Sequence, residues 1–311
     1  MKLILSEEQQ FLKDTAQSFA RDKTPTTHFR KLRDDENTKC WDDSIWQEMV
    51  QLGWSGILVP EEFGGSDFGI AGISVIMQEL GKTLTPSPML ATSVLGVSAI
   101  KLLGSNEQKK IYLPKIVSGE TTTALAIDEG NHHNPFDIEA TATLEGDKWT
   151  LNGQKVFIID GASADFILIV ARTSGEEGES NGLSVFIADK NSKGLEVSQI
   201  STADCRNYAN LIMNNLILDE NALLGEVDIA GEVIEQVLDL GRIAMASEML
   251  GNTEEAFEIT VSYLKERKQF GVLIGSFQAL QHRAAKMFCE IELTKSAVLA
   301  AMHAADENSN E

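Results

Sequence analysis

Apolar residues recur every three or four positions over most of residues 6–120, a spacing that predicts a series of helices, each with one buried side. The capping boxes Ser6-Glu-Glu-Gln9 and Ser105-Asn-Glu-Gln108 predict the starts of the first and last helices of this region. The run Ser55–Gly65 contains glycines and a proline that break the period, so it predicts an extended segment and a turn. The remaining helices are predicted from Asp42 or Asp43 to Gly53, from Gly69 to Gly81, and from about Pro88 to Leu103.

Near Thr121 the pattern changes to short β-rich runs bounded by turn residues. The sequence Glu145-Gly-Asp-Lys148 predicts a hairpin turn, and Asn152-Gly153 predicts a second tight turn. Strands at such regular spacing favour a small antiparallel barrel or sandwich. The predicted strands are Thr121–Ile127, Ala140–Leu144, Trp149–Leu151, Val156–Ile159, Phe166–Ala171, Leu183–Ala188, Leu195–Val197 and Tyr208–Leu218.

The helical period returns from about Asp228. The segment Ile229–Phe270 predicts one very long helix, and such a length suggests a bundle, often one shared between subunits. Cations in its last turns suit the carbonyl end of the helix dipole, and Gly271 predicts its end. These cations are Lys265, Arg267 and Lys268, and a last helix is predicted from about Phe277 to Ala305.

Composition indicates a soluble globular protein, because 311 residues suffice for two or three domains and 43% of them are apolar. The 26 basic and 47 acidic residues give a net charge of −21, which repels nucleic acid and anionic membranes. No signal peptide opens the chain and no apolar run approaches the ~20 residues that span a bilayer, so we expect a cytoplasmic protein. The cysteines Cys40, Cys205 and Cys289 have no paired spacing, which argues against a disulfide framework or a zinc site.

The corner between the last two predicted helices combines cations with an aromatic residue and two glutamines. Arginine pairs bidentately with phosphate and amides bond to sugar hydroxyls, so this corner could hold an anionic, planar, ribose-bearing ligand. From the residues alone, a capped helix-helix corner without a ligand is the favoured interpretation, and the ligand site is the alternative.

The corner residues Glu266-Arg-Lys-Gln-Phe-Gly271 and Phe277-Gln-Ala-Leu-Gln281 closely resemble the corner with which acyl-CoA dehydrogenases grip the FAD of a neighbouring subunit. Other segments are similar to further parts of the same family, so the resemblance extends from the amino end to Ala305. These segments are Leu52-Gly-Trp54, Val59–Gly65, Glu107–Pro114, Ser118-Gly-Glu120 and Leu151-Asn-Gly-Gln-Lys155.

The resemblance implies an α+β acyl-CoA dehydrogenase fold in three parts. These are an N-terminal helical domain at residues 1–120, a middle antiparallel β domain at 121–227, and a C-terminal helical bundle at 228–311 that is shorter than in the family, as in a truncated chain. Together with Asp128-Glu-Gly130 and Ser276–Arg283, the pattern looks most like the smaller-subunit branch. That branch includes pimeloyl-CoA dehydrogenase small subunits and members acting on steroid side chains or dicarboxylic acyl chains, several in α2β2 assemblies.

The implied function is FAD-dependent α,β-dehydrogenation of an acyl-CoA thioester, with electrons passing to an electron-transferring flavoprotein. Arg267, Phe270 and Gln278 match positions that reach the pyrophosphate and ribose of FAD across a subunit interface, with Gln281 nearby. The resemblance therefore also implies an oligomer that forms through the C-terminal helices.

The middle segment departs from the family pattern where the flavin ring is expected. Phe157 can stack on the isoalloxazine, but Ile159 stands where relatives carry a hydroxyl and cannot bond to flavin N5. The loop that begins Ile127-Asp128 replaces a Thr-Glu-Pro motif that relatives use on the phosphate side. Weaker or absent flavin contact on this face is expected.

The catalytic base is not identified by the resemblance. One family position for the glutamate, directly before an arginine in the long helix, is occupied by Gly241 before Arg242. The other lies in a segment beyond the end of this chain. Glu248 is a weak candidate, on the same face but about 10.5 Å further along by helical rise. Arg242 matches a residue near the acyl-CoA in relatives, and pairing with Asp239 or Glu235 is the alternative.

Other site types find little support in the sequence. His132-His133 has no third ligand nearby and reads as turn-forming, so no metal site is predicted, and no G-x-G-x-x-G follows a strand. A second functional hypothesis is a catalytically silent subunit that completes another chain's flavin site. A third, a flavin oxidase or monooxygenase on the same scaffold, is supported by no residue.

Overall fold

The computed structural model describes residues 4–35, 39–204 and 206–308, and its contacts divide the chain into two compact units. The helical unit comprises residues 1–30, 68–85 and 242–311, and the sheet unit comprises residues 31–67 and 86–241. Within the described residues, no helix is both long enough and apolar enough to cross a membrane. Among the described residues, Cys40 and Cys289 form no disulfide bond, and Cys205 lies outside the described residues.

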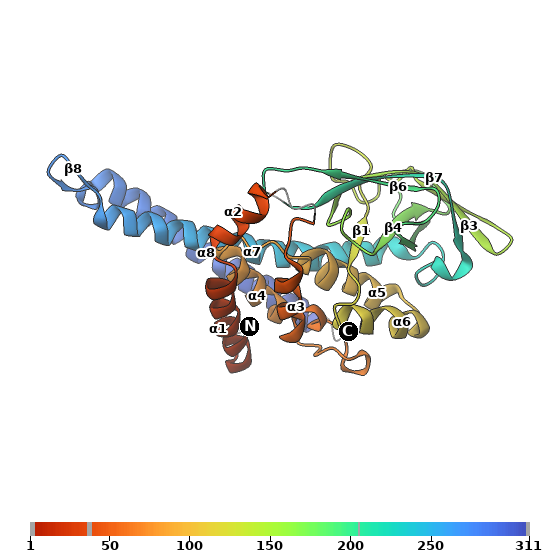
Figure 1. Ribbon diagram of the computed structural model, residues 1–311, viewed down its shortest axis with the longest axis horizontal. Helices are drawn as coiled ribbons and strands as arrows, with labels where there is room; N and C mark the ends of the chain where they lie inside the picture. The colour runs from red at the N-terminus through yellow and green to blue at the C-terminus, as the bar shows by residue number, and fades with distance from the viewer. Residues whose placement is uncertain (1–3, 36–38, 205, 309–311) are drawn as a thin grey trace. The chain divides into compact units, whose positions relative to one another are not determined.

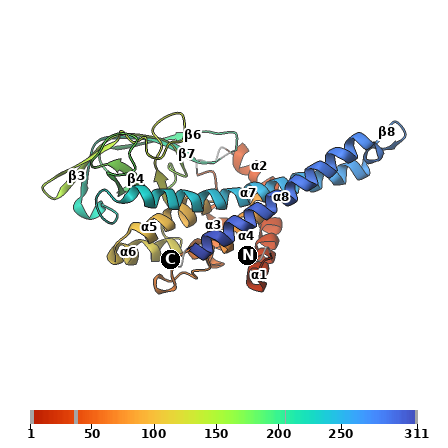
Figure 2. The same ribbon diagram turned by 180° about the vertical axis from the view of Figure 1, so that it is seen from behind.

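The helical unit is built from α1 (Glu7–Lys23), α4 (Ile70–Lys82), α8 (Gln278–Asn308) and most of α7 (Ala230–Glu266). The capping box at Ser6 is confirmed, since its hydroxyl accepts a hydrogen bond from the Gln9 N–H at 3.1 Å. The second half of α7 and α8 lie side by side in both views (Figure 1 and Figure 2). The buried apolar cluster that joins these helices contains Ala71, Val75, Leu250, Ile291, Val298 and Met302.

Glycines allow α4 and α7 to approach each other closely. A Cβ on Gly251 would lie 1.8 Å from the carbonyl oxygen of Gln78, and one on Gly81 would lie 2.2 Å from that of Glu248. Gly251 is therefore a contact point within the continuous helix α7.

The predicted end of the long helix at Gly271 is wrong by a few residues. α7 ends at Glu266, and β8 (Lys268–Gln269) pairs with β9 (Val272–Leu273) in a small hairpin before the 3-10 turn η5 (Ile274–Ser276). Phe270 and Gly271, with φ of +53° and +79°, form the turn. The hairpin replaces the last helical turn because consecutive left-handed residues favour a two-residue hairpin loop over a helix.

The sheet unit begins with helices and 3-10 turns. The extended segment predicted at Ser55–Gly65 is wrong: this stretch forms two short 3-10 turns, because Gly53 and Gly64 adopt left-handed conformations beside them. Helical elements were correctly predicted elsewhere, although the segment after Pro88 begins with a π-helical stretch. The elements that match a predicted helix are α3 (Asp43–Gln51), η3 (Met89–Gly96), α5 (Val97–Leu103) and α6 (Asn106–Val117). The two 3-10 turns are η1 (Trp54–Gly56) and η2 (Glu61–Phe63), and α2 (Thr26–Asp34) was not predicted.

The sheet has the strand order β1-β4-β2-β3-β7-β6, with β5 paired to β4. Most pairings are antiparallel, but β1 pairs with β4 in parallel, which the sequence did not predict. Figure 1 shows β3 and β7 as long strands that lie side by side. The strands are β1 (Thr123–Ala126), β2 (Thr141–Glu145), β3 (Lys148–Ile159), β4 (Phe166–Arg172), β5 (Leu183–Asp189), β6 (Leu195–Ile200) and β7 (Tyr208–Asp219), followed by η4 (Glu220–Ala222).

The tight turn predicted at Asn152-Gly153 is wrong, because β3 continues through these residues. The pairing shifts here by one residue of β7, and the Asn215 N–H donates to the side-chain oxygen of Asn152 at 2.8 Å. Gly153 has φ of +134°, and a Cβ on it would lie 2.7 Å from the Cα of Ala140. The glycine thus permits close passage of two chain segments instead of a reversal.

Candidate functional site

An exposed aromatic ring marks the bulge near the end of β3. The pairing with β7 skips from Lys155 to Ile158, so Val156 and Phe157 form the bulge. Phe157 has φ of +56°, an unusual value for a bulky residue, and its side chain is 55% exposed. Its N–H donates instead to the side-chain oxygen of Asn210 at 3.1 Å.

The ring of Tyr208 supports that of Phe157. The two rings stack with centroids 4.4 Å apart and planes inclined by 29°. The Tyr208 hydroxyl donates to Asp204 at 3.4 Å, and burial together with that carboxylate raises the pKa of Tyr208 to about 12. The hydroxyl therefore stays protonated at neutral pH.

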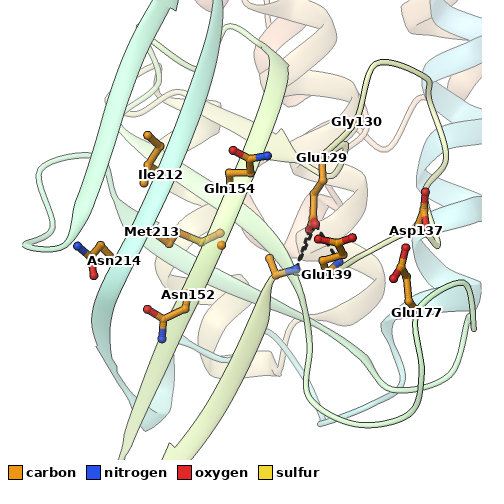
Figure 3. Close-up of a pocket in the computed structure, with 12 residues that line it drawn as sticks. Glu129, Gly130, Asp137, Glu139, Asn152, Gln154, Glu177, Ile212, Met213 and Asn214 are labelled. Atoms are coloured by element: carbon orange, nitrogen blue, oxygen red, sulfur yellow. Dashed lines mark hydrogen bonds between the residues drawn. The ribbon is translucent and has the colours of Figure 1, made fainter.

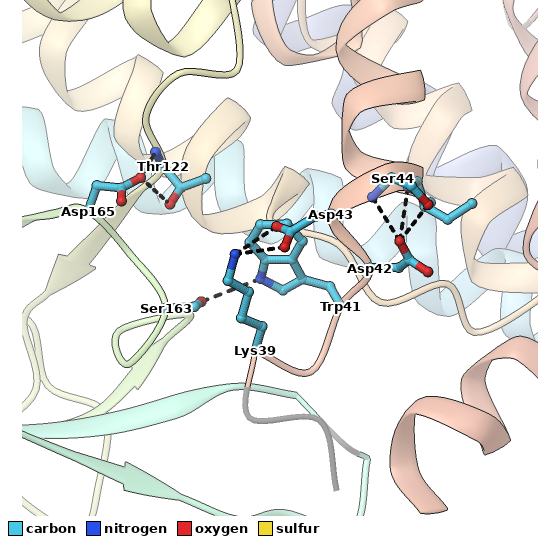
Figure 4. Close-up of polar contacts among 9 residues, drawn as sticks. Lys39, Trp41, Asp42, Asp43, Ser44, Thr122, Ser163 and Asp165 are labelled. Atoms are coloured by element: carbon cyan, nitrogen blue, oxygen red, sulfur yellow. Dashed lines mark hydrogen bonds and ion pairs between the residues drawn. The ribbon is translucent and has the colours of Figure 1, made fainter. Parts of the chain in front are cut away.

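The turn after β3 is held by contacts from two other segments (Figure 4). The indole N–H of Trp41 donates to the Ser163 hydroxyl at 3.4 Å. The carboxylate of Asp165 accepts the backbone N–H of Thr122 at 2.7 Å and its hydroxyl at 3.0 Å. These bonds fix the turn that follows Ile159, a half-buried residue whose side chain has no polar atom.

A buried ion pair lies beneath the loop that follows β1. The ammonium of Lys155, fully buried in β3, lies 2.6 Å from Glu129 and donates to the Ile127 carbonyl at 2.8 Å. Burial lowers the pKa of Lys155 to about 8, although the nearby Glu129 opposes the shift. The sequence analysis missed this pair, yet the alternation along β3 places Lys155 on the same face as the buried Trp149 and Leu151.

Asp128 serves the structure of its own loop. Its carboxylate lies 2.9 Å from Nδ1 of His133 and accepts the Asn134 N–H at 3.2 Å, while its carbonyl accepts the Val156 N–H at 2.7 Å. Among the residues that the structure describes, no group of three or more His, Cys, Asp and Glu side chains could hold a metal ion. His133 therefore acts as a partner of Asp128 within this loop.

A pocket beside this loop is acidic (Figure 3). The pocket, of about 720 Å³, is lined by the carboxylates of Glu129, Asp137, Glu139 and Glu177. Glu129 accepts the N–H groups of Glu139 at 2.8 Å and Ala140 at 3.1 Å. A hydrogen bond with Asp137 and the charge of Glu139 raise the pKa of Glu177. Carboxylates gathered on one surface disfavour a bound diphosphate, and the loss of phosphate contacts on this face stays a prediction.

The hairpin between α7 and α8 brings the four predicted nucleotide contacts together. Arg267 is exposed, and the Phe270 side chain, 92% exposed, meets the ring of Phe277 edge-on at 6.2 Å. Gln278 starts α8 in an exposed position, while the Gln281 amide donates to the Gly275 carbonyl at 2.9 Å. A cation, an aromatic ring and an amide are thus available at one exposed tip.

The candidate base and substrate residues on α7 differ in their exposure. Gly241 is buried, and a Cβ on it would lie 2.6 Å from Cδ2 of Leu95, so η3 fills the space of a side chain there. Asp239 and Arg242 are exposed, and Glu248 is half-buried with its carbonyl against α4. None of these observations assigns a base.

FAD fits the described residues in part. The tip of the α7–α8 hairpin offers the charge and amides that a pyrophosphate and ribose require, and Phe157 offers an exposed ring for stacking. Ile127 and Ile159 provide no side-chain hydrogen-bond donor, and Asp128 is anionic. The nucleotide half of the cofactor therefore fits better than the polar edge of its ring.

The chain matches three domain families along its length. These are the acyl-CoA dehydrogenase N-terminal domain over residues 6–120, the middle domain over 126–219 and the C-terminal domain over 231–311.

Individual relatives agree with these matches. Acyl-CoA dehydrogenase FadE12 of Mycobacterium tuberculosis is 30% identical over 94% of this chain and 75% of its own length. The caffeyl-CoA reductase-Etf complex subunit CarC of Acetobacterium woodii is 29% identical over 99% of this chain and 82% of its own length. The structure of butyryl-CoA dehydrogenase from Megasphaera elsdenii superposes with a TM-score of 0.88 at 26% identity, and the match covers 99% of this chain and 82% of that structure's chain. The chain therefore belongs to the acyl-CoA dehydrogenase family of FAD-dependent oxidoreductases, with the α+β fold predicted from its sequence.

Proposed function

We propose that this chain takes part in the α,β-dehydrogenation of an acyl-CoA thioester. The observation that carries the proposal is the hairpin tip, where Arg267 and the 92% exposed Phe270 lie beside Gln278. A single exposed aromatic side chain is common on protein surfaces, but its combination with a cation and an amide at one tip supports a ligand or a second chain that covers it. The tip is the part of the molecule best suited to a dinucleotide.

The flavin, when bound, supplies the acceptor for the β hydride. For the FAD of a neighbouring subunit, Arg267 would hold the pyrophosphate through its guanidinium, Gln278 and Gln281 would bond to ribose hydroxyls, and Phe270 would cover the nucleotide. In this chain's own flavin site, Phe157 would stack against the ring and the aliphatic side chain of Ile159 would exclude water. Arg242 and Asp239 lie on the exposed side of α7 and are proposed to contact the acyl-CoA.

The acyl chain is proposed to be a fatty, dicarboxylic or steroid side chain, as in the smaller-subunit branch. Asp128-Glu-Gly130 in place of the usual loop motif supports that branch. Electron-transferring flavoprotein is the proposed electron partner, because the relative CarC belongs by name to an Etf complex. A cytoplasmic location remains a prediction.

An oligomer through the helical unit is the proposed assembly. Large apolar side chains stay exposed along the second half of α7 and the first half of α8, and a second subunit would cover them. These side chains are Ile259 (61%), Tyr263 (55%), Met287 (44%) and Phe288 (52%). The two boundaries between the three domains, after residues 120 and 227, likewise remain a prediction.

A catalytically silent subunit is the second candidate function. Gly241 favours it, because this position carries no proton acceptor and Leu95 occupies the adjacent space. Such a chain would still present Arg267 and Phe270 to the FAD of its partner. The two candidates differ in whether the flavin site of this chain, or only that of its partner, reacts with substrate in the assembled protein.

The deciding experiment is to purify the chain alone and together with its candidate partner chain, and to record flavin absorbance. Acyl-CoA substrates and an artificial electron acceptor are then added. We expect little or no turnover by the lone chain, because loss of a general base costs about 10²–10⁴ in rate. Bleaching of bound flavin by the lone chain at rates typical of the family would contradict this expectation and favour Glu248 as the base.

Variants at the tip test the nucleotide contact itself. Arg267→Gln should weaken FAD binding by roughly tenfold or more, since a charged hydrogen bond to phosphate contributes about 1.5–3 kcal/mol. Arg283→Gln is the matched control, because Arg283 is an exposed arginine further along α8. Equal FAD affinity of the two variants would argue against the proposed cofactor role of the tip.

A further inference from the structure

We propose that Tyr208 and Asn210 are positioning residues for the flavin ring, because together they hold Phe157 as a preformed aromatic platform. This inference rests on the proposed function, in which Phe157 stacks against the ring. It adds two residues on β7 that the sequence analysis did not single out.

The platform begins with a strained backbone. Phe157 has φ of +56° and Asp160, three residues later, has φ of +57°. Left-handed conformations are unfavourable for side chains with a Cβ, and they concentrate at functional sites where surrounding contacts hold them in place. A bulge of this kind turns a side chain that would alternate along the strand toward a new direction.

Side chains from β7 and from the residue before it supply the holding contacts. The bulge removes the Phe157 N–H from the ladder, and Asn210 Oδ1 accepts it at 3.1 Å. Asn207, which is fully buried, accepts the Asp160 N–H at 2.5 Å through its backbone carbonyl and the Ala162 N–H at 3.0 Å through Oδ1. Both ends of the strained segment are therefore fixed by asparagine oxygens, and the Asn210 bond acts directly on Phe157.

Tyr208 sets the plane of the platform. Its ring stacks on one face of Phe157 at 4.4 Å, and 55% of the Phe157 side chain remains exposed. The Tyr208 hydroxyl is tied to Asp204, which anchors the far end of that ring. A flat aromatic ligand can then add to the exposed side as a further stacked layer.

The residues near Phe157 make binding of the flavin ring depend more strongly on stacking against Phe157. Ile159 and Ile127 offer no side-chain hydrogen bond to a polar ring edge. Stacking therefore has to provide much of the orientation that hydrogen bonds would otherwise give, so loss of the support under Phe157 should be measurable in ring binding.

The test is a titration of the 311-residue chain with FAD, in which binding is monitored by quenching of flavin fluorescence and by flavin absorbance. Tyr208→Leu should weaken FAD binding about 3- to 10-fold, the effect of losing one aromatic pair, whereas Tyr208→Phe should stay within about twofold. Asn210→Ala should also weaken binding, and Asn210→Asp should restore it because it keeps an acceptor oxygen. Ile217→Ala, at a 61% exposed position further along β7, is the control that should change nothing.

Thermal unfolding of the FAD-free variants separates positioning from loss of fold. If folded Tyr208→Leu and Asn210→Ala bind FAD as tightly as the wild type, with unchanged quenching, the inference is overturned and the proposed function stands. If the wild type takes up no FAD either alone or with its partner chain, both are overturned. If Tyr208→Leu does not fold, the Asn210 pair decides, since Asn210→Ala removes a single hydrogen bond.

Discussion

Asp306 caps the helix that begins at Ile70, 236 residues earlier in the chain. Its carboxylate accepts the backbone N–H of Ile70 at 2.6 Å and that of Ala71 at 3.1 Å. The residue before α4 is Gly69, which has no side chain to cap the helix itself. A residue near the end of α8 thus satisfies orphan N–H groups of α4 and joins two distant segments of the helical unit.

Asp306→Ala should lower the free energy of unfolding by about 1–2 kcal/mol, the usual cost of losing an N-cap. Asp306→Asn keeps an acceptor oxygen but loses the charge, so it should lose less. Chemical denaturation of the three proteins measures the difference. A wild-type stability for Asp306→Ala would show that water replaces the cap without cost.

The ion pair between Lys155 and Glu129 should respond unequally to single and double substitution. Glu129→Gln leaves a buried ammonium without its counter-charge and should cost about 3–5 kcal/mol. Lys155→Met added to Glu129→Gln removes that charge, so the double variant should be more stable than the single Glu129→Gln variant. Urea denaturation at neutral pH gives the coupling; strictly additive effects would mean that the two groups do not interact.

Lys155 should also make stability depend on pH. Its pKa is lowered to about 8 in the folded chain, mainly by burial, so between this value and the ordinary 10.5 the unfolded chain binds more protons. The contribution of Lys155 to the free energy of unfolding should therefore increase as pH rises through that window, by up to about 1.4 kcal/mol per pH unit. The same contribution is lost as pH falls through 8.

The measurement for this window is the difference in unfolding free energy between wild type and Lys155→Met, because other titrating groups cancel in the difference. Above a pH of about 8, the unfolding free energy of the wild type should increase relative to that of the variant. A difference that stays constant or falls across the window would contradict a lowered pKa.

Gly241→Glu should test whether the missing base limits the chain. The new Cβ would meet the flexible end of Leu95 at 2.6 Å, so we expect folding with a loss of about 1–3 kcal/mol. With flavin bound, turnover should rise at least tenfold over wild type, within the range that a general base supplies. Gly241→Gln has the same size without the base, and an equal gain in that variant would exclude a proton-transfer explanation.

Local signals in the sequence determined most of the elements. Both capping boxes, the hairpin at Glu145–Lys148 and the long final helices depend on neighbouring residues, and the structure contains all of them. Motifs such as Glu266–Gly271 also identified the family, because they keep their spacing within one short segment.

Tertiary contacts decided what the sequence misjudged. Gly153 suggested a turn, but glycine is equally suited to a place where two segments of the chain pass closely. Only the proximity of Ala140 distinguishes the close passage from a turn. The end of α7 likewise depends on pairing between Gln269 and Val272.

The candidate site divides in the same way. The resemblance of the corner motif to the family pointed to Arg267 and Phe270, but the support of Phe157 by Tyr208 and the burial of Lys155 against Glu129 join residues from different strands and loops. Sequence periodicity reports which side of a strand a residue occupies, whereas a bulge changes that side locally. The sequence by itself therefore determined the family and its elements, and the tertiary structure decided which side chains meet, because burial and stacking depend on contacts between distant segments.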